Sequence, residues 1–158
     1  MKDATLDYAL RTTWLAVAKM YNEEAAKFDS TMATGFALLS IDPEKGTPST
    51  SLGPKMGMEP TSLSRSLRGM ENMGLIERLP DSDDGRVIRV FLTKKGVNAR
   101  RQARDLVVTV NERLRDLLGI DSVNRLLEEM KRLNEILDHP EELLQTIQSQ
   151  PPQSPTHS

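Results

Sequence analysis

The sequence has 158 residues, of which 28% are charged and 37% hydrophobic, and its formal net charge is −2. This length suits one domain-sized unit with its own core. The absence of cysteine excludes disulfides, thiol redox sensing and cysteine-ligated zinc. No apolar run reaches the length of a transmembrane helix and no signal-peptide profile opens the chain, so we expect a cytoplasmic protein without membrane association.

The N-terminal region reads as two helices. Residues 5–28 contain neither proline nor glycine, and apolar side chains recur there at helical spacing: Leu6, Leu10, Val17, Tyr21 and Phe28. Asp29 or Ser30 is placed to cap a second helix that runs to Ile41.

Residues 47–74 predict two further helices. The first is expected to start at Thr47-Pro48 and to be kinked at Pro54, which removes an internal hydrogen bond. In the second, helical periodicity places one apolar seam along the helix: Leu63, Leu67, Met70 and Gly74. The opposite face carries Thr61, Arg65, Arg68 and Asn72, which are groups that can reach phosphates and base edges. An ordinary amphipathic helix with a solvated outer face remains the alternative.

A β-hairpin is predicted next. Residues 75–79 and 87–92 are rich in apolar and β-branched residues, and the segment between them has the Pro, Asp, Ser and Gly composition of a hairpin loop. Asp84 and Arg86 lie at its tip, where the carboxylate could orient the guanidinium towards a minor groove. A solvated turn with a chance ion pair is the alternative.

These segments resemble the winged-helix domain of the MarR family of bacterial transcription regulators. The motifs that carry the resemblance are Thr61-Ser62-Leu63-Ser64-Arg65, then residues 71–78 (ENMGLIER), then Asp84-Gly85-Arg86 followed by Leu92-Thr93-Lys94-Lys95-Gly96. The resemblance covers about residues 3–138 and implies a mostly α-helical fold with a small β-wing. Pro54 and Gly69 depart from the usual pattern of the two helices, without removing an expected DNA contact.

The charge distribution supports a nucleic-acid partner. Residues 55–104 hold 11 basic and 6 acidic residues, whereas the rest of the chain is acidic. We expect double-stranded DNA as the partner and a repressor as the function. The predicted DNA-binding residues are Thr61, Ser62, Ser64, Arg65, Arg68, Asp84, Arg86 and Arg89.

Two long helices are predicted after the hairpin. Thr93 can cap the first, which Gly119 ends, and Asp121 or Ser122 can start the second, which Pro140 interrupts. Their apolar seams predict a homodimer on a pseudo-palindromic operator, with packing inside a monomer as the alternative. The expected organisation is a dimerisation helix over residues 1–30, a winged domain over 31–100, dimerisation helices over 101–148 and a disordered tail over 149–158.

The sequence offers little for catalysis. It has two histidines and no nucleotide-binding glycine spacing, so we expect no enzyme activity, no cofactor and no metal site. The resemblance implies a small aromatic or lipophilic effector. The candidates for contacting it are Trp14, Tyr21, Met32 and Phe36, although for any one of them a place in the core is the favoured alternative. A winged-helix module for protein–protein assembly is the competing function.

Overall fold

The computed structural model describes residues 5–141 and 144–145. Its elements, in chain order, are α1 (Leu6–Ala26), α2 (Met32–Ser40), β1 (Thr47–Pro48), α3 (Ser49–Met56), α4 (Pro60–Asn72), β2 (Ile76–Pro80), β3 (Ile88–Leu92), α5 (Lys94–Leu118) and α6 (Ile120–Leu137). The predicted class, mostly α-helical with a small β-wing, is confirmed. The predicted tail, residues 149–158, and residues 142–143 and 146–148 of the predicted dimerisation helices lie outside the described residues.

The chain divides into two compact units inside α5, after Val108. The first unit contains every strand of the described chain, the helices α1 to α4 and the first part of α5. The second contains the rest of α5 and all of α6. The predicted domain limits at residues 30, 100 and 148 remain predictions.

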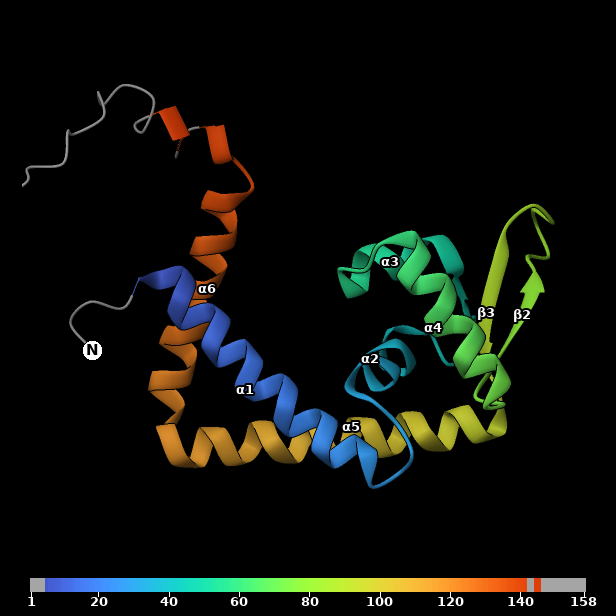
Figure 1. Cartoon of the computed structure of the whole chain (residues 1–158), viewed down its shortest axis with the longest axis horizontal. Helices are drawn as coiled ribbons and strands as arrows, with labels where there is room; N and C mark the ends of the chain where they lie inside the picture. Colours follow the sequence, from blue (N-terminus) through green and yellow to red (C-terminus); the bar gives the residue numbers. More distant parts are fainter. Residues whose placement is uncertain (1–4, 142–143, 146–158) are drawn as a thin grey trace, which may run out of the picture. The chain divides into compact units, whose positions relative to one another are not determined.

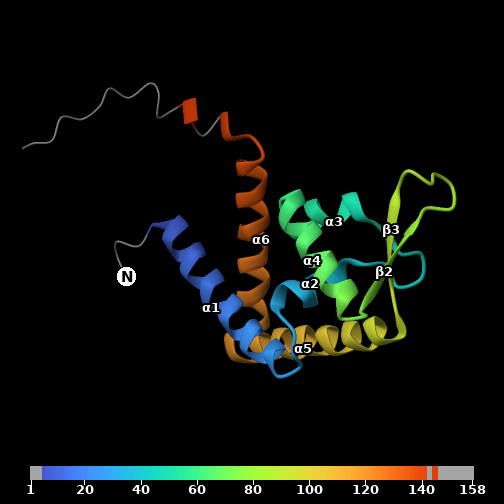
Figure 2. The same ribbon diagram turned by 45° about the vertical axis from the view of Figure 1, so that its right-hand side comes forward.

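The sheet of the first unit is antiparallel, in the order β1-β3-β2. Val90 lies at its centre, opposite Thr47 on one side and Arg78 on the other, and is fully buried. Figures 1 and 2 show the β2–β3 hairpin beside α4, with its loop extending beyond the helices. We call residues 76–92, from β2 through β3, the wing.

The core of this unit forms where α2, α3 and α4 meet the sheet. Its buried apolar residues are Ala37, Leu38, Ile41, Leu52, Leu63, Leu67, Met70, Leu75, Ile76 and Val90. Three of them, Leu63, Leu67 and Met70, form the seam that the sequence predicts along α4. Burial of this seam fixes which face of α4 remains outside.

Gly74 lies beyond α4, contrary to the prediction that it continues the seam. Its φ of +68° ends the helix, and two backbone hydrogen bonds close the end: the Leu75 N–H donates to the Met70 carbonyl at 2.9 Å and the Gly74 N–H to the Glu71 carbonyl at 2.9 Å. This is the Schellman arrangement, in which glycine accepts the left-handed conformation at little cost. The chain therefore turns directly from α4 into β2.

Several local predictions near the helix ends differ in detail from the structure. Thr47-Pro48 is a strand, so α3 starts at Ser49, and Pro54 lies inside this helix two residues before its end. Thr31, rather than Asp29 or Ser30, caps α2 through a 3.1 Å hydrogen bond from the Thr34 N–H. Local residue preferences allowed each of these neighbouring residues to cap, and the tertiary fold selects one.

The start of α5 is anchored tightly against the segment that follows α4. Thr93 caps α5 as predicted, because its hydroxyl accepts from the Gly96 N–H at 3.0 Å. The same hydroxyl donates to the Gly74 carbonyl at 2.7 Å. Gly96 lies so close to the chain that an added Cβ would fall 1.9 Å from the Leu75 carbonyl oxygen. Gly119, with a φ of +82°, ends α5 as predicted.

Candidate nucleic-acid interface

The outer face of α4 is exposed and carries the predicted contact residues. Burial of the apolar seam leaves Arg65 and Arg68 in solvent, together with Thr61, Ser62 and Ser64. A shallow depression on this face is lined by Pro60, Thr61, Ser64, Arg65 and Arg68. Four of the eight predicted DNA-binding residues, two of them arginines, thus line the same depression.

The N-terminus of α4 adds hydrogen-bond donors to this surface. Pro60 occupies the first turn, and the preceding Glu59 makes no side-chain cap hydrogen bond. The first turn of a helix has N–H groups without intrahelical partners and a positive dipole end. A phosphate placed there would be favoured by both.

The opposite end of α4 is tied to the wing. Arg78 on β2 donates to the Glu71 carboxylate, through its Nε at 3.1 Å and through a second, shorter bond from the guanidinium. The Arg78 side chain lowers the pKa of the Glu71 carboxyl below its ordinary value. The pair therefore links the helix and the strand that follows it.

The wing tip presents Arg86 to solvent. Its side chain is 92% exposed, and both its backbone N–H and its Nε donate to Asp84 Oδ1 at 3.1 Å. The carboxylate therefore orients the guanidinium at the predicted position. Such an orientation suits insertion of a single cation into a narrow groove.

Arg89 has different surroundings from the other predicted contact residues. Its side chain is 27% exposed, and its guanidinium lies 2.6 Å from Asp81 Oδ2. A further nitrogen donates to the Lys45 carbonyl at 3.2 Å. The structure thus occupies this guanidinium with protein partners, and sequence reasoning missed both Asp81 and the loop before β1 as its neighbours.

The comparisons with known proteins agree with this geometry. The model of the MarR family matches residues 31–88. The HTH-type transcriptional regulator SarZ of Staphylococcus haemolyticus (strain JCSC1435) is 26% identical over 95 residues, which is 60% of this chain and 65% of SarZ. The match thus spans slightly less than two thirds of that relative.

Two structures with bound DNA are also similar. The transcriptional repressor CouR, bound to a 23-mer DNA duplex, is 29% identical with a TM-score of 0.74, over 82% of this chain and 92% of CouR. A mutant MarR from E. coli, complexed with operator DNA, is 26% identical with a TM-score of 0.73, over 81% of this chain and 92% of that one. Residues 31–88 thus match the MarR family, and the chain has the winged-helix fold of MarR-family transcription regulators.

The aromatic residues predicted to contact an effector belong to α1, which carries Trp14 and Tyr21, and to α2, which carries Phe36. Phe36 is 6.5 Å from Trp14 and 6.4 Å from Tyr21, measured between ring centroids, while Met32 lies at the start of α2. Partial burial raises the pKa of the Tyr21 hydroxyl. The three rings form a cluster, and the contact of these four residues with an effector remains a prediction.

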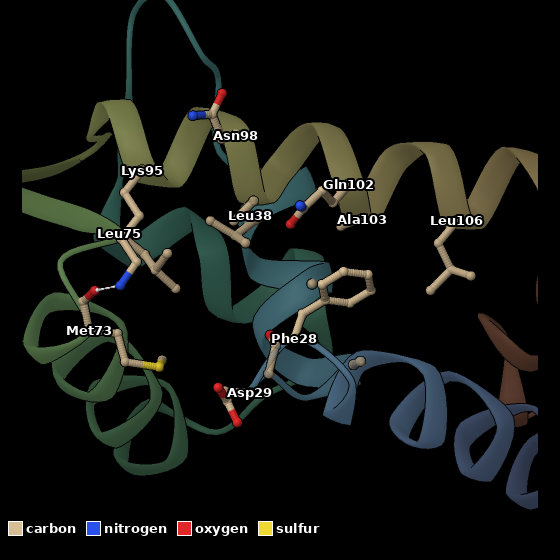
Figure 3. A pocket seen from close by; sticks show the side chains of 14 residues that line it. Phe28, Asp29, Leu38, Met73, Leu75, Lys95, Asn98, Gln102, Ala103 and Leu106 are labelled. Atoms are coloured by element: carbon tan, nitrogen blue, oxygen red, sulfur yellow. Dashed lines mark hydrogen bonds between the residues drawn. The ribbon is translucent and has the colours of Figure 1, made fainter.

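A separate pocket of about 420 Å³ lies within the first unit, and Figure 3 shows its lining. Its apolar wall includes Phe28, Leu38 and Leu106, and its rim carries Asp29 and Gln102. Lys95 also lines it and donates to the carbonyl of Met73, the residue that follows α4, at 2.8 Å. None of the four predicted effector residues lines this pocket, whose residues come from segments far apart in the sequence.

Within the described residues there is no cluster of His, Asp or Glu side chains able to hold a metal ion. In the same part of the chain, no helix is both long and apolar enough to cross a membrane.

Proposed function

We propose that this protein is a DNA-binding transcriptional repressor that acts as a homodimer on a pseudo-palindromic operator. The observation that carries the proposal is the pairing, in one unit, of an exposed arginine-bearing face on α4 with an exposed arginine at the wing tip. The helix would lie in a major groove and Arg86 would reach the adjacent minor groove. The similarity to CouR and MarR bound to DNA supports this assignment.

The homodimer is supported by the apolar side chains that the single chain leaves in solvent. No residue of α6 is buried. Four of its large apolar side chains are each at least half exposed: Leu126, Leu127, Ile136 and Leu137. On α1, Leu6, Trp14 and Leu15 are also more than half exposed. Burial of such stripes against a second copy would stabilise both chains and set the spacing of the two α4 helices at about one turn of DNA, roughly 34 Å.

A binding assay separates this proposal from the competing assembly module. Fluorescence anisotropy should be measured with duplex fragments from the protein's own promoter region and with a scrambled duplex, each at several salt concentrations. A repressor should bind its operator more tightly than the scrambled duplex, and log Kd should vary linearly with log salt. An assembly module should show neither preference nor slope.

We further propose that a small aromatic or lipophilic effector relieves repression by binding the pocket lined by Phe28, Leu38 and Leu106. The pocket volume of about 420 Å³ is within the usual range for small-molecule sites. Its Lys95–Met73 hydrogen bond lies at the end of α4, so a ligand that displaces Lys95 would alter how this helix is held. A tenfold change in operator affinity requires the ligand to favour one state by about 1.4 kcal/mol.

The effector proposal can be tested by filling the pocket. Gln102→Trp places a large ring at its rim, and Arg101→Trp places the same ring at an exposed neighbouring site outside the lining. A panel of small aromatic acids and lipophilic compounds should raise the melting temperature of the wild type and of Arg101→Trp, but not of Gln102→Trp. Equal shifts for all three proteins would place the ligand elsewhere.

A further inference from the structure

Two arginines in the wing, three residues apart, have opposite environments. The Arg86 side chain is almost fully exposed, whereas Arg89 is largely covered and its ion-pair partner Asp81 has a side chain only 9% exposed. Arg89 Nε donates to Asp81 Oδ2 at 2.7 Å, and a second guanidinium nitrogen lies 2.6 Å from the same oxygen. This is a charge-assisted pair with little freedom to reach outwards.

Arg89 also holds the loop before β1. Its third nitrogen donates to the carbonyls of Lys45 and Gly46 at 3.2 and 3.4 Å. The loop is closely fitted there, because Gly46 has a φ of +62° and an added Cβ would lie 2.7 Å from the Phe91 ring. The guanidinium thus joins β3, the wing loop and the loop before β1. We call this set of contacts around Asp81 and Arg89 the wing brace.

The brace continues into the wing tip through the second oxygen of Asp81. Asp81 Oδ1 accepts from the backbone N–H of Asp83 at 2.9 Å and, less closely, from that of Asp84 at 3.4 Å. Asp84 in turn accepts from the backbone and the guanidinium of Arg86. An unbroken series of hydrogen bonds therefore runs from the covered Arg89 to the exposed Arg86.

We propose that Asp81 and Arg89 are positioning residues for DNA binding, which hold the wing tip so that Arg86 is presented to the groove. This inference rests on the proposed DNA-binding function. It assigns Arg89 to the interior of the wing rather than to direct contact with DNA, and it gives an acidic residue a favourable role in binding a polyanion. The brace acts by reducing the conformational freedom that the wing loop would otherwise lose on binding.

The decisive test asks whether removing the Asp81 carboxylate strengthens or weakens DNA binding. Asp81→Asn keeps the shape of the side chain, but its amide has only one acceptor oxygen, so it cannot accept from both Arg89 and the Asp83 N–H. Charge alone predicts that removing a carboxylate strengthens DNA binding, whereas loss of the brace predicts weaker binding. The matched control is Asp83→Asn, which removes the same charge from the exposed part of the same loop and keeps the backbone N–H that Asp81 accepts.

We expect Asp83→Asn to bind the operator at least as tightly as the wild type and Asp81→Asn to bind it more weakly. The loss should not exceed that of Arg86→Ala, and loss of one such arginine contact corresponds to roughly 5- to 150-fold in Kd. Arg89→Lys keeps the charge but cannot form the same fork, so it should also weaken binding. If Arg89 instead contacted a phosphate directly, lysine should largely replace it.

A double-mutant cycle excludes a merely structural explanation. If the brace acts through Arg86, then Asp81→Asn should cause little further loss in an Arg86→Ala background, whereas independent effects would add. Hydrogen exchange without DNA gives a second readout, in which Asp81→Asn should speed exchange at Asp83 and leave the core of α4 protected. All proteins should be compared below their melting temperatures.

Tighter or unchanged binding by Asp81→Asn, additive losses in the cycle, or unchanged exchange at Asp83 would each overturn the inference. Absence of operator binding by the wild type would instead overturn the proposed function, and the inference with it. The two failures are distinguishable, because failure of the inference appears only in the variants, whereas failure of the proposed function appears already in the wild type.

Discussion

Helices α4 and α6 are both amphipathic, yet the chain covers the apolar face of one and leaves the other open. In α4, Leu63, Leu67 and Met70 are at most 7% exposed, whereas Leu126 and Leu137 in α6 are each 50% exposed. The same periodic pattern therefore has two meanings: a seam that the chain satisfies itself, and a seam that a partner would satisfy. Because the apolar face of α4 is buried, its polar face is exposed, and Arg65 and Arg68 lie there in solvent.

The covered seam of α4 depends on a close backbone approach just beyond its end. We expect Gly96→Ala to lower the free energy of unfolding by about 3 kcal/mol or more, at or above the upper range for overpacked sites, because the new Cβ would meet the Leu75 carbonyl at 1.9 Å. Thermal unfolding at a fixed protein concentration measures the effect.

Gly69→Ala is the matched control for that substitution. Gly69 lies inside α4, and an added Cβ has no neighbour within 4 Å. Removing the helical glycine should raise the stability by about 0.5–1 kcal/mol. A Gly69→Ala variant less stable than the wild type, or a Gly96→Ala variant of unchanged stability, would contradict this packing of the two glycines.

The open seam of α6 is tested by placing a charge on it. Leu126→Glu should shift the protein from dimer to monomer in light scattering at micromolar concentration, since substituting a residue at the centre of an interface can cost about 2 kcal/mol or more. Glu128→Gln, on the same helix, should leave the association state unchanged. A wild-type protein that is already a folded monomer would show that the exposed stripe has another role.

The polar face of α4 should matter for DNA and little for stability. We expect Arg65→Ala to weaken operator binding by roughly 1–3 kcal/mol and to relax specificity at one base pair. Arg101→Ala removes the same charge from exposed α5 and should have a much smaller effect. Equal losses for the two variants would show that net charge, rather than the position of Arg65, determines affinity.

The sequence predicts elements whose signal is local. The seam of α4, the hairpin loop, the Thr93 cap and the end of α5 at Gly119 follow from spacing and residue type, and the structure contains each of them. Strand β1 has no such signal, because it consists of two residues and exists only through its pairing with β3. The prediction for Gly74 is wrong because angular position alone cannot tell a helical residue from the glycine that ends the helix.

The site shows the same limit. Exposure of Arg65 and Arg68 could be predicted, because burial of one face of an amphipathic helix exposes the other. The covered position of Arg89 could not, because its partners include Lys45 and Gly46, which are 44 and 43 residues away in the sequence. The pocket lined by Phe28 and Leu106 likewise joins segments that share no local motif. Long-range neighbours, rather than residue type, distinguish the covered Arg89 from the exposed Arg86.

The smallest expected effect concerns the junction between α4 and the wing under acid conditions. The hydrogen bond from Arg78 lowers the pKa of the Glu71 carboxyl in the folded protein below its ordinary value. The folded state therefore binds this proton less readily than the unfolded state, and the pair stabilises the fold above the unfolded pKa. That contribution declines as the pH falls through the folded pKa.

Replacing the Glu71 carboxyl should therefore change both the stability and its dependence on pH. We expect Glu71→Gln to lower stability at neutral pH and to flatten the decline of the unfolding free energy below about pH 5. Denaturant unfolding at a series of pH values through this acid range measures the effect, with Glu77→Gln on exposed β2 as the carboxylate control. If Glu71→Gln and the wild type lose stability in parallel over this range, the ion pair between the helix and the strand contributes nothing to holding α4 in place.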